Sequence, residues 1–203
     1  VRVKDLTLDP SVFPNAEELQ KSENLGRLKT TTAMGDRDND GFYEEIYGYG
    51  GRSFAIMDGN SGNIIYDSGN DIAVRTAFTG FFNWNEDAGS FDDRSDDKGA
   101  EPEAITVGDI DGKSYAFVGL ERQGGIMMYD ITGIIKPKFV GYFNGRNFFG
   151  DGTKMTGGDI SPESLVFIPA DKTPPAYRAL NNSPLLIGAY ELSGSTAVYQ
   201  INN

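Results

Sequence analysis

The chain has 203 residues, with 18 Lys and Arg against 30 Asp and Glu, so its net charge is −12, and it contains no His and no Cys. These counts exclude a Ser-His-Asp triad, a thiol nucleophile, disulfide bonds and zinc sites built on imidazole or thiolate. They also argue against nucleic-acid binding, because a phosphate backbone would meet a strongly negative protein surface. We expect no zinc, haem or nucleotide cofactor. A bound metal must be held by oxygen, which favours Ca²⁺ or Mg²⁺, and of these two we expect Ca²⁺.

The length fits a single domain or a large part of one. No apolar run reaches the ~18 residues of a membrane span, so none is expected. The chain opens at Val1-Arg2-Val3 and shows no basic stretch followed by an apolar segment, so no signal peptide is visible.

The first expected element is a short helix over residues 14–21, with Asn15 as N-cap and Glu18 closing a capping box. After it, short runs of β-forming residues are separated by Gly, Asn and Asp, which predicts an all-β protein with this one short N-terminal helix. Two turns, 58–62 and 111–112, are typical of hairpins. The clearest predicted strands are 45–49, 53–57, 63–66, 114–118, 125–129 and 196–199.

An acidic loop over residues 35–45 carries the sharpest motif. Carboxylates at alternate positions can converge on one hard cation, Gly41 permits a sharp turn, and a backbone carbonyl and a last carboxylate can close the site. The expected ligands are Asp36, Asp38, Asp40, Phe42 and Glu44. The loop is not an EF-hand, because Tyr47 stands at the twelfth position and we expect strands on both sides. The alternative is a solvated acidic turn that binds nothing.

A second acidic stretch covers residues 86–103. It contains eight acidic residues and only two basic ones, Arg94 and Lys98. It is either a solvated loop, a second divalent-cation site, or a surface that faces cations or mineral. The acidic residues are Glu86, Asp87, Asp92, Asp93, Asp96, Asp97, Glu101 and Glu103, of which Asp96, Asp97, Glu101 and Glu103 are the secondary candidates for metal binding.

An internal repeat organises the second half of the chain. Residues 114–131 match 183–201, and the offset from Glu121 to Glu191 is the same as that from Ile131 to Ile201. Upstream, 101–105 matches 161–165, and 46–58 is a weaker third copy. Repeated units of short antiparallel strands are typical of β-propeller blades.

The repeat therefore predicts a propeller of four-stranded blades, of which about three are present. The expected organisation within a single domain (1–203) is an N-terminal segment (1–30), a first blade with the calcium loop (31–85), a second blade (86–150) and a third (151–203). An ordinary β-sandwich is the alternative. Because three blades leave open edges, we expect the rest of the propeller on another segment or subunit.

The repeat also groups glutamates. Glu103 matches Glu163 and Glu121 matches Glu191, so a ring of carboxylates around a propeller channel is expected. Such a ring can hold a metal, or it can be neutralised by nearby cations such as Arg94, Lys98 and Arg122. In the catalytic alternative, metals held by carboxylates would activate water, with these candidate residues: Glu101, Glu103, Glu163 and Arg94.

Several long motifs resemble the C-terminal part of the choice-of-anchor I domain family, which includes mesenchyme-specific cell-surface glycoproteins and bacterial proteins described as atypical alkaline phosphatases. The resemblance implies an exported or surface-anchored propeller that lacks the family's N-terminal half. It supplies no defined catalytic set, and Ala100 and Ala104 stand where family members often carry Pro and Gly. The motifs are residues 25–28, 50–54, 91–103, 115–122, 125–131 and 162–170.

Three functions follow as expectations. The first is a non-catalytic, calcium-binding propeller module in surface, adhesion, matrix or mineral interaction, which the absence of reactive residues favours. The second is a calcium-dependent phosphoric monoester hydrolase. The third is a structural subunit of a larger extracellular assembly that pairs along open sheet edges. All three imply an extracellular, periplasmic or cell-surface location, and the partner is the other half of the propeller, another subunit or a matrix component.

Overall fold

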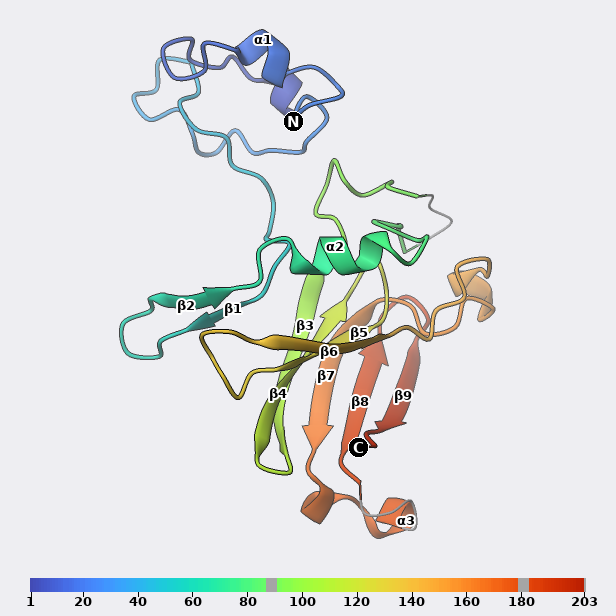
Figure 1. Ribbon diagram of the computed structural model, residues 1–203. Coiled ribbons are helices and arrows are strands. Elements are labelled where there is room, and N and C mark those ends of the chain that lie inside the picture. The colour runs from blue at the N-terminus through green and yellow to red at the C-terminus, as the bar shows by residue number, and fades with distance from the viewer. Residues whose placement is uncertain (87–90, 179–182, 203) are drawn as a thin grey trace.

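The computed structural model describes residues 1–86, 91–178 and 183–202 (Figure 1). Within them the protein is mostly β, with antiparallel sheets and few helices. The strands are β1 (Ala55–Met57), β2 (Ile64–Asp67), β3 (Pro102–Ile110), β4 (Lys113–Leu120), β5 (Ile126–Asp130), β6 (Lys138–Phe143), β7 (Pro162–Ile168), β8 (Leu185–Tyr190) and β9 (Ser195–Gln200). The helices are α1 (Ala16–Leu19), α2 (Asp71–Ala77) and α3 (Pro175–Arg178), with 3-10 turns at Val3–Asp5, Gly152–Lys154 and Ala170–Lys172.

Two sheets form the lower body of the molecule. One has four strands in the order β3-β4-β5-β6, the other has three in the order β7-β8-β9, and β7 contacts both β3 and β4 (Figure 1). The rings of Phe117 and Phe167 stack between the sheets with centroids 5.8 Å apart. Apolar side chains from both sheets therefore share one core, whose buried members are Ala104, Ile110, Phe117, Ile126, Leu165 and Leu186.

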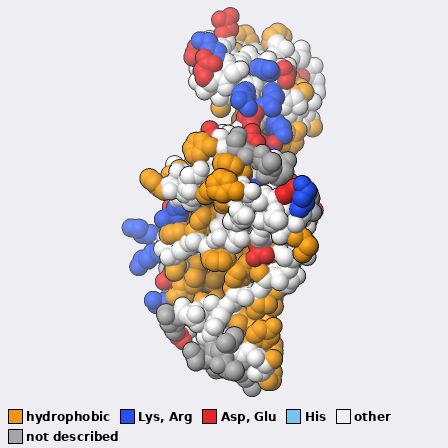
Figure 2. Space-filling view, turned by 90° about the vertical axis from the view of Figure 1, so that its right-hand side faces the viewer, with side chains coloured by type: hydrophobic (Ala, Val, Ile, Leu, Met, Phe, Trp, Pro, Cys, Tyr) orange, Lys and Arg blue, Asp and Glu red, His pale blue; other side chains and the backbone are white. Residues whose placement is uncertain are grey.

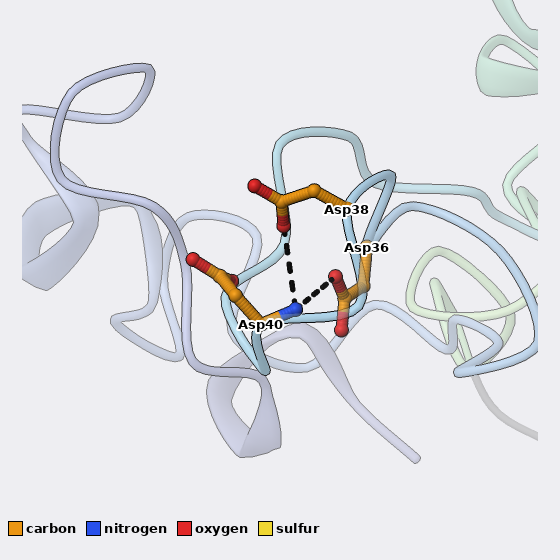
Figure 3. A group of neighbouring side chains, drawn as sticks. All are labelled: Asp36, Asp38 and Asp40. Atoms are coloured by element: carbon orange, nitrogen blue, oxygen red, sulfur yellow. Dashed lines mark hydrogen bonds between the residues drawn. The ribbon is translucent and has the colours of Figure 1, made fainter.

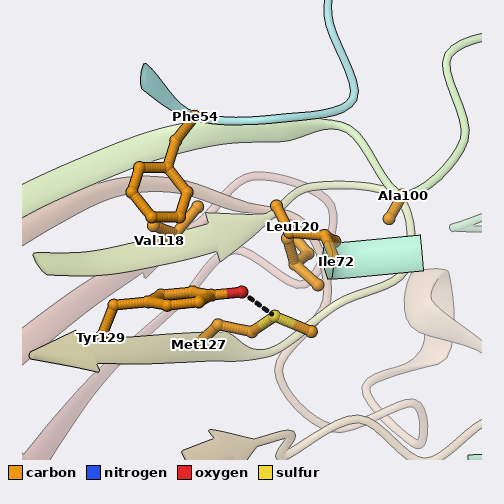
Figure 4. Close-up of a cluster of buried hydrophobic side chains, with 7 residues drawn as sticks. All are labelled: Phe54, Ile72, Ala100, Val118, Leu120, Met127 and Tyr129. Atoms are coloured by element: carbon orange, nitrogen blue, oxygen red, sulfur yellow. Dashed lines mark hydrogen bonds between the residues drawn. The ribbon is translucent and has the colours of Figure 1, made fainter. Parts of the chain in front are cut away.

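A second core covers the opposite face of the four-stranded sheet (Figure 4). Tyr129 lies at its centre, 1% exposed, with its ring 4.8 Å from that of Phe54 and its hydroxyl donating to Asp71 at 2.9 Å. Because Asp71 begins α2, this hydrogen bond fixes the helix to the sheet. The cluster consists of Phe54, Ile72, Ala100, Val118, Leu120, Met127 and Tyr129.

The N-terminal segment is mostly irregular and lies apart from the sheets (Figure 1). Gln20 holds it together, because its side-chain amide donates to the carbonyls of Val3 and Leu6 at 2.9 and 2.7 Å. Lys29 links it to the loop before β3, where its backbone N–H donates to the carbonyl of Asp96 at 3.0 Å.

The internal repeat is also present in the hydrogen bonds. The N–H of Ile131 donates to Ser114 at 2.8 Å, and the N–H of Ile201, its counterpart in the second copy, donates to Pro184 at 3.0 Å. The β3–β4 and β7–β8 pairs each have a register shift near their start, at 102/104 and 162/164. The two sheets are therefore copies of one antiparallel unit.

Three local predictions were wrong. The helix spans only Ala16–Leu19 and Asn15 makes no side-chain cap, because its backbone is not in the extended conformation that capping needs. Residues 45–49 form no strand, and their β-pairing is limited to one isolated bridge between Gly48 and Thr30. The acidic loop is therefore not flanked by strands. Helix α2 was missed; it places Ile72 and Thr76, four residues apart, on its buried face.

The number of strands per unit also differs from the prediction. In the described residues only the sheet β3–β6 has four strands, whereas β1–β2 has two and β7–β9 has three. The segment 31–85 is therefore a short hairpin followed by a helix and not a four-stranded blade. The sheets of residues 1–86, 91–178 and 183–202 do not form a closed propeller, and the division of the chain into blades remains a prediction.

Candidate functional site

The acidic loop brings three carboxylates together (Figure 3). One oxygen each of Asp36, Asp38 and Asp40 lies within 4.8 Å of the others, which is close enough to share a cation. Asp36 is fixed by the backbone, since its two oxygens accept the N–H groups of Asp40 at 3.1 Å and of Gly41 at 3.0 Å. Each carboxylate oxygen retains a second lone pair that a metal can use.

Backbone geometry explains why this sequence folds into such a loop. Asn39 and Gly41 have positive φ angles of 61° and 92°, in the left-handed region that Asn tolerates and Gly favours. The N–H groups of Glu44 and Glu45 both donate to the carbonyl of Gly35, at 2.9 and 3.1 Å, and so close the loop.

The electrostatics of the loop oppose ionisation in the absence of a cation. Reduced hydration, followed by the charges of Asp40, Glu44 and Asp36, raises the pKa of Asp38 above its usual value. A bound divalent cation would reverse this effect, because an opposite charge favours the ionised carboxylate.

Two of the predicted calcium ligands lie differently from the three aspartates. Glu44 is outside the converging group; its carboxylate accepts the backbone N–H of Arg37 at 2.8 Å. Phe42 is exposed, and its N–H donates to Asp40 at 2.8 Å. The described structure therefore assembles the aspartates of the predicted site but not its closing glutamate.

A second group of carboxylates lies where β3, β4, β7 and β8 begin or end. Glu101, Glu103 and Glu121 have oxygens within 4.8 Å of one another, as do Glu121, Glu163 and Glu191. Of the two pairs of glutamates that the repeat matched, Glu121 and Glu191 are thus neighbours, and Glu121 is common to both groups.

Glu101 is 1% exposed and its negative charge is balanced by cations. It forms ion pairs with Arg94, with Lys98 at 2.9 Å and with Arg122 at 3.2 Å. Such a carboxylate has its lone pairs occupied by donors, so its surroundings suit structural pairing better than metal binding. Neutralisation of the glutamates by nearby cations is one of the two alternatives that the sequence left open.

Glu121 is nearly buried and less well compensated. Burial, together with a hydrogen bond that protonated Glu121 donates to Glu103 and the charges of Glu103 and Glu163, raises the pKa of Glu121 to about 7. Lys98, which pairs with Glu103 at 3.0 Å, lowers the pKa of Glu103. The carboxyl groups of Glu121 and Glu103 therefore share a proton near neutral pH.

Asp96 and Asp97 belong to neither carboxylate group, although Asp97 shares its partner Arg94 with Glu101. Asp96 pairs with Arg2 at 2.5 Å and with Arg27 at 3.1 Å, and these partners lower its pKa despite its partial burial. Asp97 pairs with Lys29 at 2.5 Å and with Arg94 at 3.0 Å. The two aspartates fasten the N-terminal segment to the body, which the sequence did not indicate; Asp87 of the same stretch is outside the described residues.

Another contact that sequence reasoning missed joins the two sheets at the glutamates. Glu86 pairs with Arg122 and accepts a hydrogen bond from Ser161 at 2.8 Å, although the two residues are 75 positions apart. In the sequence, Glu86 is one of the eight acidic residues of the stretch 86–103, and nothing there distinguishes it from the others. Its partner Ser161 has no sequence signal beyond its place in the repeat.

Comparison with known proteins places the chain in a family. The sequence profile of the Choice-of-anchor I domain matches residues 2–134. The chain belongs to the choice-of-anchor I domain family. It is also similar to Gigasin-3a of Magallana gigas, with 27% identity over 198 residues that cover 90% of this chain and 66% of the relative. No solved structure matches it.

The family match includes the aspartate loop and the first glutamate group, whereas Glu163 and Glu191 lie beyond residue 134. Membership in this family fits an extracellular or surface-associated module. Among the described residues, no helix has the length and apolar character needed to cross a membrane.

Proposed function

We propose that the chain is a non-catalytic, calcium-binding module that acts at the cell surface or outside the cell in adhesion, matrix or mineral interaction. The observation that carries this proposal is the convergence of Asp36, Asp38 and Asp40 in a loop already held by its own backbone. A loop shaped before binding loses little conformational entropy when the cation arrives.

The role of the cation would be structural. Asp36, Asp38 and Asp40 come from one loop, so the ion mainly fixes that loop. The neighbouring residue Tyr43 accepts a hydrogen bond from Asp9 at 3.0 Å and donates one to Thr7 at 2.8 Å, so the loop is attached to the N-terminal segment. Calcium binding is therefore expected to stabilise this segment as a whole.

Thermal unfolding with and without calcium tests the proposal. Saturating Ca²⁺ should raise Tm by about 5 °C. The Asp38→Asn variant should lose this rise, because it removes one charge while the amide oxygen can still accept the hydrogen bond of Asp40. Asp58→Asn is the matched control, since Asp58 caps another exposed turn without acidic neighbours in it. An equal rise in all three proteins, or none in the wild type, would contradict the proposal.

A metal-dependent phosphoric monoester hydrolase is the second candidate. It is favoured by the proximity of Glu101, Glu103 and Glu121, because paired carboxylates can hold metals that activate water. The ion pairs of Glu101 weigh against it, since they occupy the oxygens that a metal needs. Turnover of p-nitrophenyl phosphate that needs Ca²⁺ and is lost in Glu103→Gln would establish the enzyme, and its absence supports the binding module.

We also propose that the two larger sheets are blades of a propeller completed by further strands. The repeated hydrogen bonds of Ile131 and Ile201 support this arrangement. The partner would be another propeller half or a subunit of an extracellular assembly. A structure of the full-length protein or of the assembly, in which the sheets surround a common channel, is the appropriate test.

A further inference from the structure

Residues 1–49, here called the N-terminal unit, form a small body of their own. Neither of the two cores formed by the described residues includes a residue before Phe54. The backbone of the unit is tied to itself, since the N–H of Tyr43 donates to the carbonyl of Thr7 at 2.8 Å. The unit buries apolar side chains separately from the sheets: Val3, Leu6 and Leu8. It can therefore move as one piece.

Ion pairs join this unit to the loop before β3. Asp96 pairs with Arg2 and Arg27, and Asp97 pairs with Lys29. The side chains of Arg27 and Lys29 are 59% and 47% exposed, so water and dissolved ions reach these pairs. Figure 2 shows charged side chains of both signs gathered where the unit meets the body. Among the described residues a single backbone hydrogen bond accompanies them, from Lys29 to Asp96.

Space remains on both sides of these ion pairs. A cleft of about 650 Å³ lies between Tyr49 of the unit and Lys98 and Glu103 of the body. A second cleft, of about 260 Å³, lies between Leu25 of the unit and Asp92 of the body. The junction is thus not packed like a protein interior, and few dispersion contacts oppose its separation.

The chain passes from the unit to the body through Gly50 and Gly51. Both are exposed, and Gly50 has a φ angle of 63°, in the left-handed region that glycine adopts freely. Figure 1 shows the unit above the sheets, connected to them by this one stretch of chain. The next anchor is Arg52, whose guanidinium donates to the carbonyls of Ser95 and Asp97 at 2.6 and 2.8 Å. Rotation is therefore confined to the two glycines, as in a hinge.

We propose that the ion pairs of Asp96 and Asp97 form a salt-sensitive clasp, which holds the N-terminal unit against the body at low ionic strength and releases it to turn about Gly50 and Gly51 as ionic strength rises. Salt screens exposed charge pairs, because the Debye length falls from about 10 Å at 0.1 M to about 3 Å at 1 M.

Opening of the clasp would uncover one end of the second group of carboxylates. Lys98 and Glu103 face the unit across the larger cleft, so they become accessible to larger molecules when the unit turns away. Asp36, Asp38 and Asp40 lie inside the moving unit and keep their arrangement. The clasp therefore acts independently of calcium binding.

The test measures the distance between two spin labels by pulsed electron paramagnetic resonance. The chain has no Cys, so Glu23→Cys and Asp93→Cys can be labelled selectively, and both positions are exposed on either side of the junction. A second, longer distance should appear, with a population that rises about tenfold relative to the short one between about 0.1 and 1 M NaCl. EDTA is present throughout, so the aspartate loop holds no cation.

A variant and a control follow from the contacts. Asp96→Asn removes the charge that pairs with Arg2 and Arg27 while it keeps the size of the side chain. In the labelled protein it should show the longer distance already at low salt and respond weakly to NaCl. Glu17→Gln removes one charge from an exposed position of the unit that forms no ion pair with the described residues, and it should respond as the parent does.

Three results would overturn the proposal. The first is an unchanged distance distribution at high salt, and the second is the same shift in sucrose of equal osmolality, which does not screen charge. The third is an Asp96→Asn variant that responds to NaCl as strongly as the parent. Circular dichroism at each salt concentration establishes that the sheets remain folded; their loss at the salt that separates the labels would also contradict the clasp. If Asp96→Asn does not fold, the comparison of NaCl with sucrose decides the question.

Discussion

Glu101 and Ser161 occupy the same position in the two repeated sheets. Both are buried, with positive φ angles of 52° and 63°, and their carbonyls accept the N–H groups of Glu121 at 2.7 Å and Glu191 at 2.8 Å. One sheet thus carries a carboxylate where the other carries a hydroxyl. A buried carboxylate is stable only when its charge is balanced, as it is here by Arg94, Lys98 and Arg122, whereas a buried hydroxyl needs no counter-charge.

Replacing Glu101 by Gln should lower the free energy of unfolding by about 2–3 kcal/mol, because the buried side chain loses the charge that strengthens its contacts with three cations. The cations are only partly buried and keep other acidic partners, which for Arg94 is Asp97. Urea unfolding measures the effect. Glu163→Gln is the control: this glutamate is exposed and should change the free energy by less than about 0.5 kcal/mol. Equal stability of the wild type and Glu101→Gln would show that the ion pairs contribute nothing.

Stability should depend on pH through Glu121. Its pKa is about 7 in the folded protein, against 4.5 for the free side chain, so the folded state binds the proton more tightly than the unfolded state. The stabilisation is complete below pH 4.5 and is lost as the pH rises through 7. Glu103 acts in the opposite direction, because its lowered pKa stabilises the fold above pH 4.5. We expect the free energy of unfolding to fall between pH 5 and 8 in the wild type.

The Glu121→Gln variant isolates this contribution. It cannot titrate, so its stability should be nearly flat over the same range, while the exposed Glu191→Gln variant should keep most of the wild-type slope. Urea unfolding at several pH values provides the comparison. If Glu121→Gln shows the full wild-type slope, the proton is not held at this carboxyl group.

The close contact between the sheets predicts a third outcome. A Cβ on Gly108 would lie 2.3 Å from the ring of Phe167, so Gly108→Ala should force the sheets apart and cost about 1–3 kcal/mol. Gly141→Ala has no atom within 4 Å of the new Cβ and serves as the control. Similar melting temperatures for both variants would mean that β3 and β7 do not pack as described.

The sequence predicted the strand pairs well where strand and turn signals agreed. Strands β4, β5 and β9 lie where alternating residues and Gly or Asp turns placed them, and the internal repeat identified the equivalent glutamates. These features are local or periodic, so they can be detected in one chain. The three aspartates of the loop were found for the same reason, since they stand at alternate positions of one short segment.

Features that depend on distant partners could not be predicted. The sequence does not show that Asp96 and Asp97 pair with Arg2 and Lys29, because the path by which the chain returns to its N-terminal segment is not encoded locally. Helix α2 was missed since its seven residues give less than two turns of pattern, and its stability depends on the packing of Ile72 against the sheet. The neutralisation of Glu101 likewise requires three cations from separate positions along the chain.

Calcium titration calorimetry at neutral pH tests the central claim most directly. The wild-type chain should show saturable binding at a single site, and Asp38→Asn should show none, while Asp58→Asn and Glu103→Gln should bind as the wild type does. Retained binding in Asp38→Asn together with its loss in Glu103→Gln would move the cation to the glutamates. No binding to the wild-type protein would contradict the assignment of this chain as a calcium-binding module.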